Sequence, residues 1–122
     1  MVIDLTTLDP ELLPEQMAVS SITMAELAAG PHAARSPSAR AIRQETLQRA
    51  EAAFDPLPFD NECARAYGRV SAAVTSIGRK PRGPRMVDLL LAATACAHGI
   101  PLYTRNPHDF VGLDDLIEVI VI

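Results

Sequence analysis

The sequence is poor in aromatic residues and in lysine. Its 122 residues include no Trp, two Tyr and three Phe, and the 11 basic residues are ten Arg and one Lys. A core without large rings is filled by Ala, Leu, Ile and Val, which suits helices packed closely on a sheet. Cations that are nearly all arginine favour planar, bidentate contacts with phosphate or carboxylate groups.

Cysteine and long apolar runs are also scarce. Cys63 and Cys96 are too few for a disulfide scaffold and lack the spacing of a metal finger. No apolar run approaches the roughly 20 residues that span a bilayer, and no basic segment precedes an apolar stretch as in a signal peptide. We therefore expect a cytoplasmic protein with reduced thiols and no membrane partner.

What is present is the composition of one folded domain over residues 1–122, with 48% hydrophobic and 21% charged residues. The net charge of −4 is uneven, because residues 1–60 carry four basic and nine acidic groups and residues 61–122 carry seven and six. Between Glu62 and Asp88 every charged residue is basic: Arg65, Arg69, Arg79, Lys80, Arg82 and Arg85. This run is either a solvated helix face with a basic loop or a surface that contacts phosphates.

Helices and strands alternate in the predicted order of elements. A short apolar strand over residues 17–22 precedes a helix that begins at Thr23, where Thr23 and Glu26 have capping-box spacing, and ends near Gly30. Further helices are expected over residues 38–53, 60–77 and 87–98, the last apolar almost all round and hence buried. Strands are expected over residues 100–104 and 118–122, with 106–110 as a turn, and residues 54–59, which contain two prolines, can form only a short strand at an edge or a strand end. This order predicts an α/β fold with a mainly parallel sheet.

Four polar residues follow strands or open helices, where the carboxyl ends of parallel strands form sites. They are Glu26, Asp88, Asn106 and Asp109. Each has a simpler structural explanation, since Glu26 can close a capping box, Asp88 can complement a helix dipole, and the other two can form a turn. Clustered carboxylates repel one another, so their joint placement favours a site for Mg²⁺ or Mn²⁺.

Other catalytic patterns are absent from the sequence. His32, His98 and His108 have no partner at the spacing of a zinc motif, and no phosphate-binding glycine loop or nucleophile elbow occurs. Lys80, the single lysine, lies in a loop before the buried helix, which disfavours a phosphate-accepting receiver domain.

Three blocks of the chain resemble PIN-domain nucleases of the VapC toxin type. They are residues 21–30 (SITMAELAAG), residues 88–102 beginning DLLLAATA, and residues 104–110 (TRNPHDF), and their order and spacing match the family over about residues 15–122. The resemblance implies a three-layer α/β/α PIN-like fold and a metal-dependent ribonuclease toxin. It also implies neutralisation by a VapB-like antitoxin, and a homodimer.

Carried over residue by residue, Glu26 and Asp88 match the second and third acids of the family site. Asn106 stands where many members have a fourth acid, and Asp109 is the nearby acid of the same turn. In the family such acids hold Mg²⁺ or Mn²⁺, which activates a water for cleavage of RNA.

The beginning of the chain departs from the family pattern of an apolar strand that ends in Asp-Thr. Residues 2–7 are one reading of that strand, with Asp4 as the first metal ligand. In the reading that fits the spacing better, residues 2–5 resemble the helix after that motif. The domain then lacks or alters its first strand, and the true start lies upstream or the protein is a decayed relative.

Two functions follow from these patterns. One is a Mg²⁺-dependent endoribonuclease toxin, with phosphate contacts from Arg79, Lys80, Arg82 and Arg85. In it, Arg105 contacts either RNA or an antitoxin carboxylate. The alternative is a catalytically impaired PIN-like protein that only binds an antitoxin.

Overall fold

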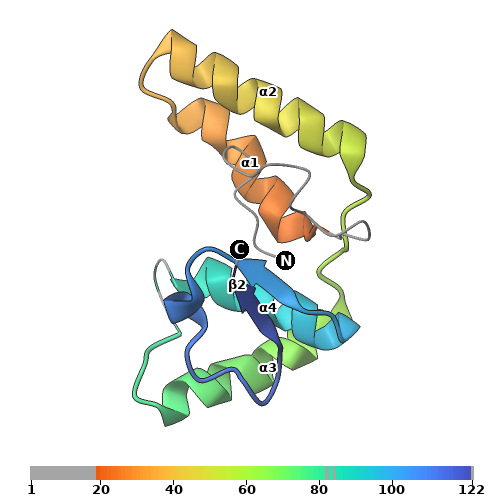
Figure 1. Cartoon of the computed structure of the whole chain (residues 1–122), viewed down its shortest axis with the longest axis vertical. Coiled ribbons are helices and arrows are strands. Elements are labelled where there is room, and N and C mark those ends of the chain that lie inside the picture. The colour runs from red at the N-terminus through yellow and green to blue at the C-terminus, as the bar shows by residue number, and fades with distance from the viewer. Residues whose placement is uncertain (1–18, 82, 84, 122) are drawn as a thin grey trace.

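The computed structural model describes residues 19–81, 83 and 85–121. Along this part of the chain lie four helices, a 3-10 helix and two strands. They are α1 (Ser21–Ala33), α2 (Pro37–Ala53), α3 (Asn61–Ser76), α4 (Arg85–His98), β1 (Leu102–Thr104), the 3-10 helix η2 (Pro107–Phe110) and β2 (Val119–Val121). Figure 1 shows α1 and α2 side by side as one helical pair, and α3 and α4 grouped with the two strands. The predictions about Asp4, Arg82 and the first strand lie outside the described residues.

The core forms between α3, α4 and the strands. The buried residues of α3 are Cys63, Ala66, Val70 and Val74, whose spacing of three and four places them on one face. Opposite them, α4 buries Leu89 and an unbroken run from Leu91 to Ala95. The prediction of a central, buried helix is confirmed. Alanines at this interface let the two helices approach closely without large side chains between them.

The sheet is short, and its pairings in the described residues are parallel. β1 pairs with β2 in the register Leu102 with Val119 and Thr104 with Val121. A separate parallel bridge joins Ser20 to Leu57, where the Ser21 N–H donates to the Leu57 carbonyl and the Leu57 N–H donates to the Val19 carbonyl, each at 2.8 Å. Residues 54–59 thus contribute one bridge where a short edge strand was expected, because the partner segment enters helix α1 at Ser21.

Helix α1 begins earlier than its sequence predicts. Ser20 is the N-cap, with its Oγ accepting the Ile22 N–H at 3.0 Å, and Thr23 is a buried residue of the first turn. The predicted capping box between Thr23 and Glu26 is therefore wrong, and Glu26 lies in the second turn. The bond from the Ser21 N–H to Leu57 starts the helix at this point, since it holds Ser20 in an extended conformation.

The pair formed by α1 and α2 is lightly packed. In α2, Ala50 is the buried residue, and Ile42 is 61% exposed. Arg43 of α2 donates to the Gly30 carbonyl of α1 at 2.9 Å and ties the two helices together. Among the described residues, none of the helices has the length and apolar character needed to cross a membrane.

Asp60 caps the N-terminus of helix α3, and this contact makes the stability of the protein depend on pH. The Asp60 carboxylate accepts the Cys63 N–H at 3.0 Å, and this backbone hydrogen bond lowers the pKa of Asp60. Because the pKa of Asp60 is lower in the folded than in the unfolded protein, ionised Asp60 stabilises the fold fully above the unfolded pKa. This stabilisation is lost as the pH falls through the folded pKa.

We expect Asp60→Ala to lower the melting temperature by a few degrees at neutral pH, because the N–H groups of the first turn lose their acceptor. Asp60→Asn keeps an acceptor oxygen and serves as the matched control. Thermal denaturation followed by circular dichroism at neutral pH and below about pH 3 measures the effect. An Asp60→Ala deficit that stays constant over this range would contradict the assignment.

Candidate active site around Asp88

Asp88 is the central carboxylate of the candidate site. It lies in the first turn of α4, which begins at Arg85 and whose next turns are buried. A carboxylate is favoured there, because the N-terminus of a helix carries partial positive charge. The side chain is partly buried, and the burial raises the pKa of Asp88. The buried body of α4 therefore fixes this acid at the rim of the core.

Glu26 faces Asp88 from the neighbouring helix. The two helices α1 and α4 are in contact, and the charge of Asp88 raises the pKa of Glu26, second to the effect of burial. The Glu26 side chain is largely exposed, yet the protein around its carboxyl group still displaces enough water to raise the pKa.

Asp109 approaches Asp88 from the other side. It lies in η2, which packs against α4, and its charge raises the pKa of Asp88. Arg85, one turn before Asp88, acts in the opposite direction and lowers that pKa. Glu26 and Asp109, on separate elements, thus each interact electrostatically with Asp88, which is the neighbour that they share.

The three acids are spaced apart and do not form a closed set of metal ligands. Across residues 19–81, 83 and 85–121, no three His, Cys, Asp or Glu side chains come together as a compact set of metal ligands. The donors present are nevertheless of the type that Mg²⁺ uses, since it is held by one or two carboxylates and keeps several waters. Asp88 with two acidic neighbours fits that pattern better than it fits a closed cage.

The residues at the end of β1 shape the turn that carries Asp109. The buried Thr104 Oγ1 accepts the Asn106 N–H at 3.0 Å and bends the chain directly after the strand. Asn106 is the N-cap position of η2, with an exposed side chain that makes no capping bond. The role of Thr104 was missed from the sequence, although a hydroxyl residue at the end of a strand is a known signal for a turn.

The basic residues take up different positions. Arg85 adjoins Asp88, whereas Lys80 and Arg105 are exposed. Arg79 is partly buried, and its guanidinium bonds to His108 in η2. Arg79 is thus held by His108 within the protein, and Arg85 interacts with Asp88.

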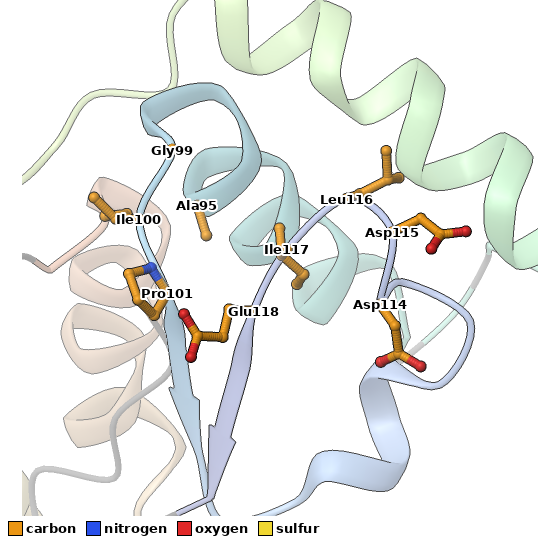
Figure 2. Close-up of a pocket in the computed structure, with 9 residues that line it drawn as sticks. All are labelled: Ala95, Gly99, Ile100, Pro101, Asp114, Asp115, Leu116, Ile117 and Glu118. Atoms are coloured by element: carbon orange, nitrogen blue, oxygen red, sulfur yellow. The ribbon is translucent and has the colours of Figure 1, made fainter.

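A cavity of about 390 Å³ lies at the opposite ends of α4 and β1 (Figure 2). Its lining comes from the end of α4, the entry to β1 and residues 114–118. Figure 2 shows Glu118 turned toward Pro101, whereas Asp115 points away from Ile117. None of the predicted site residues lines it, so the carboxylates around Asp88 are separate from this cavity.

The raised pKa of Glu26 makes a prediction about stability. Because the pKa of Glu26 is higher in the folded than in the unfolded protein, the folded protein binds more protons in the pH window between the two values. Stability then falls as the pH rises through the window, and the penalty is complete above the folded pKa. We expect Glu26→Gln to raise the melting temperature at neutral pH by about 1 to 2 °C.

The control for this measurement is Glu51→Gln, since Glu51 is an exposed residue of α2. Differential scanning calorimetry in the presence of a chelator compares both variants with the unchanged chain. A melting temperature that falls in Glu26→Gln would show that the Glu26 carboxylate is stabilising and not repelled.

Comparison with known proteins agrees with this geometry. Residues 6–115 match the PIN domain. The chain is 35% identical to Ribonuclease VapC5 from Mycobacterium tuberculosis over 115 residues, which are 94% of this chain and 82% of that protein. It is also 35% identical to VapC ribonuclease Y4jK from Sinorhizobium fredii, over 90% of this chain and 79% of that protein.

Solved structures show the same relationship. The crystal structure of VapBC-5 from Mycobacterium tuberculosis matches with a TM-score of 0.78 at 34% identity, over 95% of this chain and 88% of that one. FitAcB from Neisseria gonorrhoeae matches with a TM-score of 0.71 at 27% identity, over 89% of this chain and 77% of that one. The predicted PIN-like α/β/α fold is confirmed, and the chain belongs to the PIN-domain family as a VapC-type member.

Proposed function

We propose that the chain is an endoribonuclease toxin that depends on Mg²⁺ or Mn²⁺ and cleaves RNA phosphodiester bonds. The observation that carries this proposal is Asp88, whose pKa is raised by burial and by the charge of Asp109, and which in turn raises the pKa of Glu26. The VapC relatives named as ribonucleases support the same reaction class.

In the proposed site, Asp88 holds the cation, and Glu26 and Asp109 supply adjacent carboxylate oxygens. A divalent cation bound there would supply an activated water near neutral pH and would neutralise charge on the phosphate. The repulsion of Asp88 by Glu26 and by Asp109 would favour such binding, because a cation would remove it. Glu26 would also be able to accept a proton from the attacking water. Asn106 contributes a neutral amide oxygen or donor at the same edge.

The substrate contacts proposed here come from the basic residues near the start of α4. Arg85 adjoins Asp88, and exposed Lys80 and Arg105 lie in the loops on either side of α4 and β1. Arg82 belongs to this set by its sequence position. Cations of this kind hold the phosphate backbone while the acids act on one bond.

The partner proposed is a cognate VapB-like antitoxin that neutralises the nuclease in the cytoplasm. Support comes from the relative VapBC-5, which is described as a member of a toxin-antitoxin family. Arg105 beside Asn106 is placed to meet either an RNA phosphate or an antitoxin carboxylate. A homodimer completes the proposal, and sedimentation of the purified chain measures it.

Removal of the central carboxylate tests the reaction. Asp88→Asn is expected to lower RNA cleavage by at least about 100-fold, because the site loses the charge that both neighbours share. Cleavage by the unchanged chain should stop with a chelator and return with Mg²⁺ or Mn²⁺.

The matched control for this test is Asp115→Asn, which removes an exposed acid at the opposite end of the sheet. Full cleavage by Asp88→Asn would overturn the proposed site. If the unchanged chain binds its antitoxin but cleaves no RNA at any Mg²⁺ or Mn²⁺ concentration, the alternative of an impaired, antitoxin-binding relative is correct.

The proposed phosphate contacts predict a salt dependence. In the inactive Asp88→Asn background, which keeps RNA intact, neutralising Lys80 and Arg82 to Ala should weaken binding. It should also flatten the plot of log affinity against log salt by about 1.4, or about 0.7 for each lost contact with a single strand. Fluorescence anisotropy over a salt series measures this slope, and an unchanged slope would make the loop an ordinary solvated surface.

A further inference from the structure

The turn that carries Asp109 is attached to the rest of the molecule at several points. On its C-terminal side, Phe110 and Leu113 are buried in the core at 2% and 0% exposure. On its N-terminal side, Thr104 holds the Asn106 N–H. Between them, Pro107 and His108 are exposed and Asp109 is partly buried, and a further contact reaches this part of the turn.

That contact comes from Arg79. Its Nη1 donates to the His108 backbone carbonyl at 3.0 Å, and its Nη2 lies 3.0 Å from the His108 Nε2. A guanidinium has donors and no acceptor, so Nε2 accepts this bond and the ring carries its proton on Nδ1. One side chain thereby grips both the backbone and the ring of the residue directly before Asp109.

Arg79 itself is held firmly by the end of α3. The Gly78 N–H donates to the Thr75 carbonyl at 3.0 Å, and the Arg79 N–H donates to the Val74 carbonyl at 3.1 Å. Gly78 has a φ of +82°, which a residue with a side chain rarely adopts. These are the two bonds and the left-handed glycine of a Schellman motif, which fixes the chain direction just after a helix.

A second contact joins the same two segments. Gly112, two residues after η2, lies against Ile77, and a Cβ on Gly112 would be 2.7 Å from the Ile77 Cδ1. The end of α3 therefore touches the turn on both sides of Phe110, through Arg79 at His108 and through Ile77 at Gly112. Two contacts restrain the orientation of the turn, which one contact alone does not do.

From this geometry we infer that Arg79 is a positioning residue, which clamps the turn of residues 107–110 through His108 and keeps Asp109 beside Asp88. The inference rests on the proposed nuclease site for its consequence. It also revises the expectation that Arg79 contacts RNA phosphates, because the Schellman motif and His108 direct its guanidinium at the turn.

The first test needs neither RNA nor metal. Hydrogen exchange of the Asp109 and Val111 amides, which donate to the Asn106 and His108 carbonyls, reports the order of the turn. Arg79→Ala should speed their exchange by about tenfold, and Arg79→Lys by less. Arg49→Ala is the control, because Arg49 is an exposed arginine paired with Glu45 within α2 at 2.6 Å. Unchanged exchange in Arg79→Ala would overturn the clamp.

The second test separates positioning from a phosphate contact. For Arg79→Ala, the affinity for Mn²⁺ measured by electron paramagnetic resonance should fall by about tenfold, as for other outer-shell residues. The salt slope of RNA binding in the Asp88→Asn background should not change. Lys80→Ala should show the reverse pattern. A reduced salt slope with unchanged Mn²⁺ affinity would overturn the clamp and restore Arg79 as a phosphate contact.

A double substitution tests the route through His108. His108→Ala should reproduce part of the loss of Mn²⁺ affinity, since the bond to the backbone carbonyl remains. Arg79→Ala combined with His108→Ala should lose no more than Arg79→Ala alone. Additive losses of Mn²⁺ affinity would contradict the proposal that Arg79 acts through His108. Faster exchange of the turn in a chain that cleaves no RNA would support the clamp and overturn the proposed function, so the two failures are distinguishable.

Discussion

The arrangement of the molecule depends on holding carboxylates together against their repulsion and partial dehydration. Asp88 has Glu26 on one side and Asp109 on the other, and burial and like charge raise the pKa of Asp88 and Glu26. The ionised forms of Asp88 and Glu26 would each be more stable alone in water. The protein meets this cost by placing Asp88 on the most deeply buried helix, where the packing of α4 leaves its first turn little freedom to move the acid away.

The other two acids are brought to Asp88 by different means. Glu26 arrives on α1, whose direction is set at its first residue by the Ser20 cap and the bridge to Leu57. Asp109 arrives on a short turn that has no extended structure of its own. That turn is held by buried Phe110, by the Thr104 hydroxyl and by Arg79 from the end of α3. The candidate site therefore draws on α1, α4 and η2, with contacts from β1 and α3, and no single segment contains it.

Much of the fold was predictable because the relevant signals are local. The helices expected over residues 60–77 and 87–98, the second from its apolar sequence, are both present as α3 and α4. Predictions failed where two local signals competed. Ser20 and Thr23 both suit an N-cap, and the long-range bond to Leu57 decides for Ser20. Residues 54–59 form one bridge instead of a short edge strand, because their partner segment enters helix α1 at Ser21.

The sequence by itself determined which residues are available for chemistry, and the identities and order of Glu26, Asp88, Asn106 and Asp109 point to one edge of a parallel sheet. Tertiary structure decided which of them interact, since a pKa shift depends on distance and burial, neither of which is encoded locally. It also decided where the Arg79 side chain lies. Its position in a basic run of the sequence predicts that Arg79 contacts phosphate. In the structure, the Schellman motif at the end of α3 directs its side chain to His108, 29 residues later in the chain. Only the folded chain brings those two residues together.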